Sequence, residues 1–238
     1  MRPPVGQVEG KKQVVEEMFD AIAPRYDLLN RVLSMGIDQG WRKRAIQLLN
    51  ETHPKRILDV ATGTADLALA AMTVKPEKIV GVDISEGMLV LGRKKIEARG
   101  LTESITLQQA DSTALPFPDA SFDAVTVAFG VRNFEQLQAG LKEMRRVLVP
   151  NGRLIVLEFS RPKAFPVKQA YQFYFKHVLP RVGTAVSGVS GPYQYLNESA
   201  MAFPDGDDFL RELRAAGFRE AVAEPQTFGI ATIYIGTV

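Results

Sequence analysis

Short apolar runs of strand length alternate with helical patterns through the middle of this chain. The first run, RILDVA at residues 56–61, lies between Pro54 and Gly63, as is typical of a buried parallel strand. Similar runs occupy residues 78–83, 104–109, 122–129 and 153–159, and helical patterns occupy residues 66–72, 87–98 and 137–147. This alternation predicts a parallel sheet with helices on both of its faces.

The end of the chain departs from this order. A helical pattern at residues 207–216 precedes two strand-like runs, at 218–223 and 229–237, with no helix between them. Two such strands can pair as a hairpin, which leaves the last strand antiparallel. The predicted fold is therefore α/β, a Rossmann-like, doubly wound, mostly parallel seven-stranded sheet with an antiparallel last strand.

Two further segments are expected to lie outside this sheet, although we treat residues 1–238 as a single domain. Residues 1–50 comprise an N-terminal arm and helices, the first of which begins near Lys11 and ends or kinks at Pro24. Residues 160–205 interrupt the strand and helix rhythm with aromatic residues at helical spacing, followed by a loop rich in Gly, Ser and Tyr. We interpret this insertion as a cover over the substrate site.

Composition and charge exclude several classes of function. The net charge is only +2, so no strong overall field attracts nucleic acid. Cysteine is absent and the only histidines are His53 and His177, so disulfides are excluded and no metal is expected. No apolar run approaches the ~18 residues that a membrane span needs. We expect a cytoplasmic protein that could contact the inner face of the membrane peripherally without crossing it.

The segment DVATGTADLA, residues 59–68, lies where the first predicted strand turns into a helix. In open α/β sheets ligands bind beyond the carboxyl ends of the strands, so this loop is expected to face a ligand. Its small residues Ala61, Gly63 and Ala65 would let the backbone approach that ligand closely. A tight turn without any ligand is the alternative interpretation.

Acidic residues at the strand ends indicate the class of ligand. Asp83 closes the second strand 20 residues after Gly63, where a carboxylate can accept hydrogen bonds from ribose hydroxyls. Nicotinamide and S-adenosylmethionine enzymes share that feature. Asp66 at the helix N-terminus would repel a pyrophosphate, and the loop lacks the G-x-G-x-x-G spacing. Asp59 and Asp111 add negative charge that suits the sulfonium and ammonium groups of S-adenosylmethionine, which is the predicted cofactor.

Longer motifs make the chain resemble a known family. Asp111 and Ser112, placed to meet an adenine ring, precede the turn LPFPDASFD, and this order resembles class I methyltransferases in general. Narrower motifs resemble the ubiquinone/menaquinone biosynthesis C-methyltransferase family (UbiE/MenG). They are YDLLNRVLSMGIDQGWR at residues 26–42, FGVRN at 129–133 and RVLVPNGRLIVLEFSRP at 146–162. HVLPRVG and YQYLNES in the insertion are similar to the family as well, so the resemblance covers nearly the whole chain from Met18 onward.

The resemblance implies the class I methyltransferase fold and S-adenosylmethionine-dependent C-methylation of an isoprenoid quinol ring. Conversion of demethylmenaquinol to menaquinol is favoured, and methylation of 2-methoxy-6-polyprenyl-1,4-benzoquinol in ubiquinone biosynthesis is the alternative. The cofactor contacts that the resemblance implies are Thr64, Asp83, Asp111, Ser112 and Ala128. The chain departs from the family's usual pattern at Ala65, where a third glycine is usual, and at Asp38, where histidine is common.

Methyl transfer to a ring carbon needs the reduced quinol, because an ionised phenolic hydroxyl enriches the neighbouring carbon in electrons. Arg132 and Asn133, just beyond the fourth strand, are predicted to hold and stabilise that ring oxygen, and no metal is required. A helix-capping Asn beside a surface Arg is the alternative interpretation. The candidates for proton removal or pocket lining are Tyr26, Asp27, Asp38 and His177.

Other functions stay open on the sequence alone. They are methylation of another small aromatic acceptor, noncatalytic binding of an adenosine ligand, and a nicotinamide dehydrogenase. The expected partner is a polyprenyl quinol, whose tail could leave between the insertion and the N-terminal helices. A homodimer is a further expectation.

Overall fold

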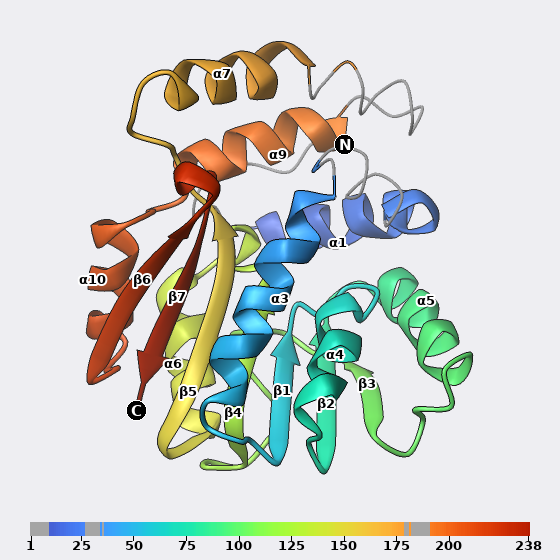
Figure 1. Ribbon diagram of the computed structural model, residues 1–238. Helices are drawn as coiled ribbons and strands as arrows, with labels where there is room; N and C mark the ends of the chain where they lie inside the picture. Colours follow the sequence, from blue (N-terminus) through green and yellow to red (C-terminus); the bar gives the residue numbers. More distant parts are fainter. Residues whose placement is uncertain (1–9, 27–33, 35, 179–180, 182–190) are drawn as a thin grey trace.

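The predicted sheet is confirmed in the computed structural model, which describes residues 10–26, 34, 36–178, 181 and 191–238. Its seven strands lie in the order β3-β2-β1-β4-β5-β7-β6 (Figure 1). Their bounds are β1 Arg56–Val60, β2 Lys78–Asp83, β3 Ile105–Gln109, β4 Phe122–Ala128, β5 Leu148–Phe159, β6 Glu220–Gln226 and β7 Ala231–Thr237. The first five strands pair in parallel, and β7 is antiparallel to both β5 and β6.

Strand β5 is the one strand whose start differs clearly from the expected position. It begins at Leu148 rather than Arg153, and its pairing with β4 shifts register between Phe122 and Ala124. Asn151 within this stretch has a left-handed backbone, with φ of 63°. A bulge of this kind hides the start of a strand from the apolar pattern, because its residues no longer alternate regularly between the faces.

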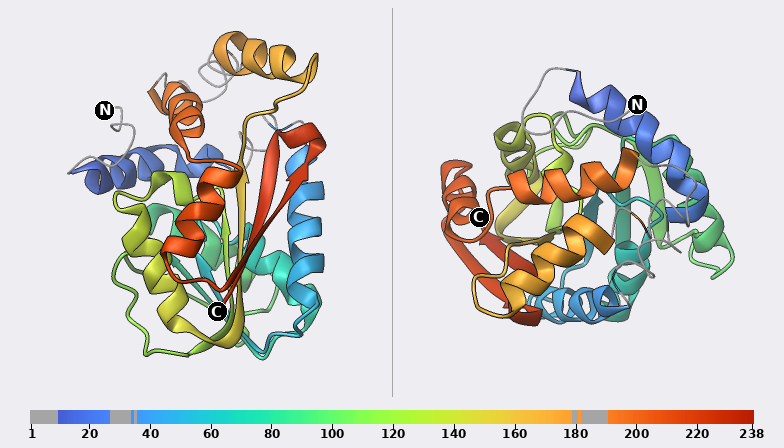
Figure 2. Two further views of the ribbon diagram at one scale, coloured as in Figure 1. Left: turned by 90° about the vertical axis from the view of Figure 1, so that its left-hand side faces the viewer. Right: turned by 90° about the horizontal axis from the view of Figure 1, so that it is seen from above.

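Helices cover both faces of the sheet, as predicted. On one face lie α6 (Leu137–Val147) and α10 (Asp207–Ala215), which share a core with Leu58 and Val60 of β1. On the other face α3 (Ile37–Asn50) and α4 (Asp66–Ala71) pack on Ile57, and α5 (Glu86–Glu97) completes this layer at the edge near β3. Figure 2 shows the layers edge-on. The order reverses between β1 and β4, so a crevice is expected at the carboxyl ends of these two strands.

Three helices lie over that carboxyl end (Figures 1 and 2). They are α1 (Lys11–Ile22), α7 (Val167–Phe173) and α9 (Gly191–Ala202). The expectation of a loop rich in Gly, Ser and Tyr was wrong from Gly191 onward, because this stretch forms α9. Burial explains the difference: Tyr195 of α9 packs against Val15 and Met18 of α1, and such packing outweighs weak intrinsic helix propensity. Within the described residues, no helix is long and apolar enough to span a bilayer.

Candidate functional site

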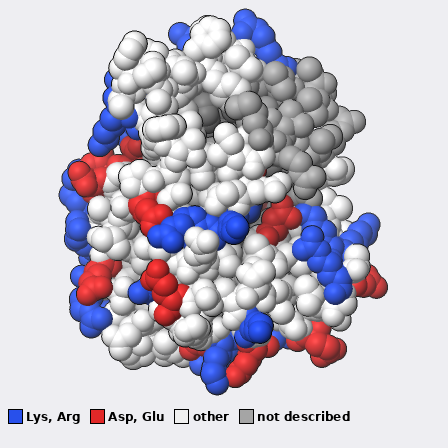
Figure 3. All heavy atoms as spheres, viewed as in Figure 1, with Lys and Arg blue, Asp and Glu red and all other residues white. Residues whose placement is uncertain are grey.

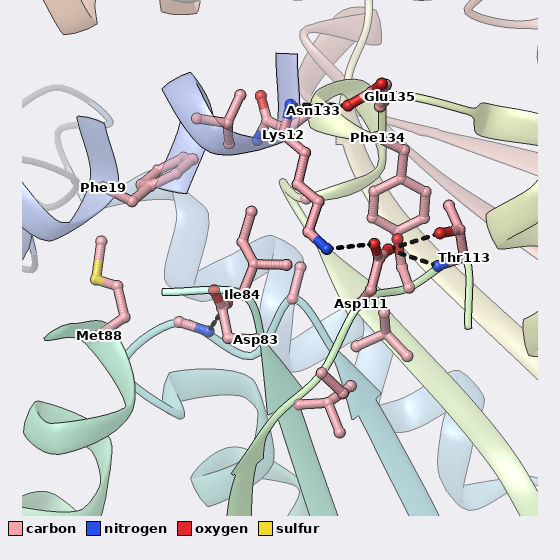
Figure 4. A pocket seen from close by; sticks show the side chains of 18 of the residues that line it. Lys12, Phe19, Asp83, Ile84, Met88, Asp111, Thr113, Asn133, Phe134 and Glu135 are labelled. Atoms are coloured by element: carbon pink, nitrogen blue, oxygen red, sulfur yellow. Dashed lines mark hydrogen bonds and ion pairs between the residues drawn. The ribbon is translucent and has the colours of Figure 1, made fainter. Parts of the chain in front are cut away.

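A cavity opens at the carboxyl ends of β1, β2 and β4, and α1 covers it (Figure 4). Its floor comes from the loops that follow the strands, including Gly63 after β1 and Asp83 and Ile84 at the end of β2. Lys12 and Phe19 of α1 line it from above. The cavity therefore lies where the strand order predicts a ligand site.

The loop after β1 has the conformation of a close-approach loop. Ala61, Gly63 and Ala65 all have left-handed backbones, with φ of 53°, 56° and 66°. Glycine adopts this region without steric cost, so the two alanines store some strain. A Cβ atom on Gly130 would lie only 2.4 Å from the Cβ atom of Ala61, so glycine is needed where the loops after β1 and β4 meet.

Asp59 holds this loop from beneath and does not line the cavity. Its carboxylate accepts hydrogen bonds from the hydroxyls of Thr62 and Thr126, each at 2.6 Å, which tie the loop to β4. Burial raises the pKa of Asp59 to about 6, although both hydroxyl hydrogen bonds oppose the shift. Thr64 is also absent from the cavity wall; it is buried, and its hydroxyl accepts a hydrogen bond from Lys95 at 2.9 Å.

Asp83 does line the cavity, and backbone groups fix its carboxylate. One oxygen accepts the Gly63 N–H at 2.8 Å and the other accepts the Ser85 N–H at 2.9 Å. Burial raises the pKa of Asp83 to about 6, and these backbone hydrogen bonds reduce the shift. The backbone N–H of Ile84 also stabilises the charged form. The carboxylate still faces the cavity, where a ligand hydroxyl can donate to it.

Asp111 lies on the neighbouring wall, beside Ser112. Its Oδ1 accepts hydrogen bonds from the N–H and hydroxyl of Thr113, both at 2.8 Å, and its Oδ2 pairs with Lys12 Nζ at 2.7 Å (Figure 4). Burial alone would raise the pKa of Asp111, but the hydrogen bonds from Lys12 and Thr113 lower it. Lys12 thus joins α1 to the loop after β3. Ala128, at the end of β4, also lines the cavity.

Arg132 and Asn133 lie side by side in a 3₁₀ turn, η3 (Val131–Asn133), but point to different places. Arg132 is 6% exposed and its Nη1 donates to Glu158 Oε1 at 2.7 Å, beneath the cavity wall rather than in it. Asn133 lines the cavity, and its Oδ1 accepts the hydroxyl of Tyr195 at 3.1 Å. No described residue accepts a hydrogen bond from Asn133 Nδ2.

The remaining candidates for proton removal are divided in the same way. Tyr26 lines the cavity and packs edge-on against Phe19, with 6.0 Å between the ring centroids. His177 does not line the cavity and stacks on Phe173 at 5.3 Å. Asp38 accepts a hydrogen bond from the hydroxyl of Ser34 and forms an ion pair with Arg42, four residues later in α3. Asp27 lies outside the described residues.

The cavity therefore brings together six of the predicted site residues and omits five others that the structure describes. Those in its wall are Tyr26, Asp83, Asp111, Ser112, Ala128 and Asn133, and those outside it are Asp38, Asp59, Thr64, Arg132 and His177. Sequence reasoning missed Lys12 and Tyr195. Tyr195 lies in the motif YQYLNES, but nothing in that motif indicates its partner.

The model of the ubiE/COQ5 methyltransferase family matches residues 7–238 of this chain. The chain is 50% identical to a demethylmenaquinone methyltransferase of Deinococcus radiodurans, over 99% of this chain and 97% of that protein. It is 47% identical to a ubiquinone/menaquinone biosynthesis C-methyltransferase of Geobacter sulfurreducens, over 95% and 89% of the two chains.

Solved structures with the same fold are more distant in sequence. A SAM-dependent methyltransferase of Thermotoga maritima aligns with a TM-score of 0.65 at 18% identity, over 93% of this chain and 98% of that one. A SAM-dependent methyltransferase of Aquifex aeolicus aligns with a TM-score of 0.57 at 17% identity, over 77% and 82%. The family model matches the chain almost from end to end, and a relative is 50% identical over nearly its whole length. This chain therefore belongs to the ubiE/COQ5 methyltransferase family.

Proposed function

We propose that this protein transfers a methyl group from S-adenosylmethionine to a ring carbon of an isoprenoid quinol, converting demethylmenaquinol to menaquinol. The names of its relatives support the reaction class. The observation that carries the proposal is a cavity at the switch point of the sheet whose wall holds three carboxylates, those of Asp83, Asp111 and Glu135. Methylation of the benzoquinol in ubiquinone biosynthesis is the second candidate, since the name of the Geobacter relative includes both ubiquinone and menaquinone biosynthesis.

The residues of the cavity fit an adenosine-containing methyl donor. The Asp83 carboxylate lines the cavity and can accept hydrogen bonds from ribose hydroxyls, which would relieve the cost of its burial. Asp111 and Ser112 can accept hydrogen bonds from the adenine amine if Lys12 releases one carboxylate oxygen. The same carboxylates would repel a pyrophosphate, which argues against a dinucleotide.

When bound, S-adenosylmethionine supplies an electrophilic methyl group. The residues of this chain then have to hold the quinol ring in line with it and stabilise the charge on its ionised oxygen. Asn133 is suited to that task, because Tyr195 occupies its Oδ1 and leaves the Nδ2 donors for the cavity. Tyr26 and Phe134 provide aromatic surface in the same wall.

Direct contact between Arg132 and the quinol stays a prediction. The guanidinium is paired with a fully buried carboxylate, Glu158, and would have to leave that partner to reach the cavity. In the described arrangement Arg132 supports the turn from behind, because its own backbone N–H also donates to Glu158, at 3.3 Å. Proton removal by His177 likewise stays a prediction, since its ring is stacked on Phe173.

Methyl transfer from isotope-labelled S-adenosylmethionine to a short-tail demethylmenaquinol tests the proposal, with the product identified by mass spectrometry. We expect a methylated ring with the reduced quinol and none with the oxidised quinone, because only the quinol has a hydroxyl to ionise. Faster turnover of the matching benzoquinol would replace the favoured substrate with the second candidate. Tight donor binding without transfer to either quinol would instead indicate a noncatalytic adenosine-binding module.

The position of the enzyme in the cell and its assembly belong to the same proposal. A polyprenyl quinol partitions into lipid, so we infer that a cytoplasmic enzyme acting on it works peripherally at the inner face of the membrane. The homodimer stays a prediction, and sedimentation equilibrium of the purified protein tests it.

A further inference from the structure

Two phenylalanines, one at each end of α7, are largely exposed on the surface of the molecule. Phe165, which leads into α7, is 80% exposed, and Phe173, at the end of the same helix, is 63% exposed. Tyr171 of the same helix points inward instead, is 6% exposed and packs with Ala200 of α9. The helix therefore has an inner face that covers α9, while Phe165 and Phe173 remain largely exposed, although one side of the Phe173 ring contacts His177.

Positive charge surrounds these side chains. Lys168 of α7 and Lys176, three residues beyond its end, are both exposed, and together with Phe165 and Phe173 they define what we call the α7 face. The sequence from residue 159 to 197 contains five Lys or Arg and no Asp or Glu. The remaining residues carry 24 basic and 27 acidic side chains, a net charge of −3, so the excess of basic over acidic residues in the chain comes from this segment, in which Arg161 is paired with Asp205.

The surface view agrees with this pattern. At the top of the molecule in Figure 3, over α7, white and blue atoms meet with no red among them, whereas red and blue atoms alternate lower down. Exposed aromatic rings among lysines, without carboxylates, are what an anionic bilayer surface accommodates: the rings enter the headgroup boundary and the lysines pair with lipid phosphates.

We propose that the α7 face docks on an anionic lipid bilayer and presents the covered end of the sheet to it. This docking proposal rests on the proposed function in one respect: a lipid-soluble quinol has to pass from the bilayer into the cavity. The position of the face supports it: α7 lies on α9, and Tyr195 of α9 contacts both α1 and Asn133 in the cavity wall. In a docked enzyme, α7 and α9 would therefore lie between the lipid and Asn133 in the cavity wall (Figure 2).

Vesicle co-sedimentation tests the docking. We expect the protein to bind vesicles of equal parts phosphatidylglycerol and phosphatidylcholine and to bind pure phosphatidylcholine weakly. The double variant K168Q/K176Q should lower the affinity for the anionic vesicles about 30-fold, at about 1 kcal/mol for each lysine near the surface. F165S/F173S should lower the affinity for both vesicle types at least about tenfold, because it removes the apolar anchors.

A matched control comes from α5, which lies away from α7 (Figure 1). The variant V90S/K94Q removes one exposed apolar side chain and one exposed lysine there, and it should leave vesicle binding unchanged. The proposal is overturned if V90S/K94Q weakens binding as much as the α7 variants do. It is overturned equally if the α7 variants lose affinity for an RNA homopolymer while vesicle binding persists.

Activity measurements separate this proposal from the function on which it rests. With a water-soluble short-tail quinol, F165S/F173S should retain the native kcat/KM, because the α7 face lies outside the cavity wall. With a long-tail quinol embedded in vesicles, the same variant should lose at least about tenfold in rate, in line with its lost binding. If the native protein methylates neither quinol but still binds anionic vesicles, the proposed function fails and the docking surface stands. Equal rates with the embedded quinol overturn the docking proposal.

Discussion

Binding of an adenosine ligand should weaken in acid because of Asp83. Folding raises the pKa of this carboxyl group from 3.8 to about 6, mainly through burial. The shift lowers the free energy of unfolding by about 3 kcal/mol when Asp83 is charged. This destabilisation is complete above pH 6 and disappears as the pH falls below 3.8, the pKa in the unfolded chain. Two ribose hydroxyls would stabilise the charged form, so the ligand should return the pKa to about 4.

The expected size of the effect follows from these two pKa values. At pH 7 nearly all Asp83 is charged in the free protein, whereas at pH 5 about nine molecules in ten must first release a proton. The dissociation constant should therefore rise about tenfold between pH 7 and pH 5 and about twofold between pH 7 and pH 6. Isothermal titration with 5′-methylthioadenosine measures it, since this ligand keeps the ribose and adenine but lacks the amino acid group that would titrate with the donor.

Two variants decide whether Asp83 is the source. Asp83→Asn should bind the ligand more weakly at pH 7 and show no rise in the dissociation constant down to pH 5. Asp59→Asn is the matched control, because the pKa of Asp59 is also raised to about 6 by burial. Its oxygens are held by Thr62 and Thr126 whether or not a ligand is bound, so this variant should keep the native pH dependence. A flat profile in the native protein, or a slope that survives in Asp83→Asn, would refute the assignment.

Three further outcomes follow from buried polar groups. Tyr195→Phe should lower kcat about tenfold, because the Asn133 amide is no longer held, and should lower the free energy of unfolding by about 1 kcal/mol. Tyr234→Phe is the control at a buried tyrosine away from the cavity, whose hydroxyl accepts the Gly206 N–H and hydrogen-bonds to Thr232; it should lower the free energy of unfolding by a similar amount and leave kcat unchanged. Glu158→Gln should lower the free energy of unfolding in urea by about 3–5 kcal/mol, because it leaves the buried Arg132 without its counter-charge. Burial lowers the pKa of Lys11 to about 8, so the native protein should gain up to about 3 kcal/mol of stability between pH 8 and pH 10.5, and Lys11→Met should lack that gain in urea unfolding at the two pH values.

The sheet could be predicted because buried parallel strands appear in a sequence as continuous runs of apolar residues. β2 has the bounds that the run KIVGVD indicates, and α6 has those of its helical pattern. Asp83 and Asp111 could be assigned to the cavity for the same reason: once the strands are known, the residues at their carboxyl ends must meet at one edge of the sheet.

Contacts between the covering helices and this edge could not be predicted. The pair of Lys12 and Asp111 joins residues 99 positions apart, and Tyr195 meets Asn133 across 62 positions. Neither pair has a local pattern, because the position of α1 and α9 depends on what they bury and not on their own periodicity. The composition of α9 indicated a loop, whereas the packing of Tyr195 on α1 and of Ala200 on Tyr171 stabilises the helix.

Asp59 and Arg132, which the sequence placed in the cavity, lie behind its wall for a geometric reason. Asp59 is the last but one residue of β1, so its side chain is still inside the sheet and bonds to the neighbouring strand, whereas Asp83 ends β2 and Asp111 follows β3. A strand-end acid therefore reaches the ligand only from the last position of the strand or beyond. In the turn after β4, two consecutive residues point in different directions. The Arg132 side chain pairs with Glu158 of β5, whereas the Asn133 side chain lines the cavity, so of the two Asn133 is the one placed to contact a substrate.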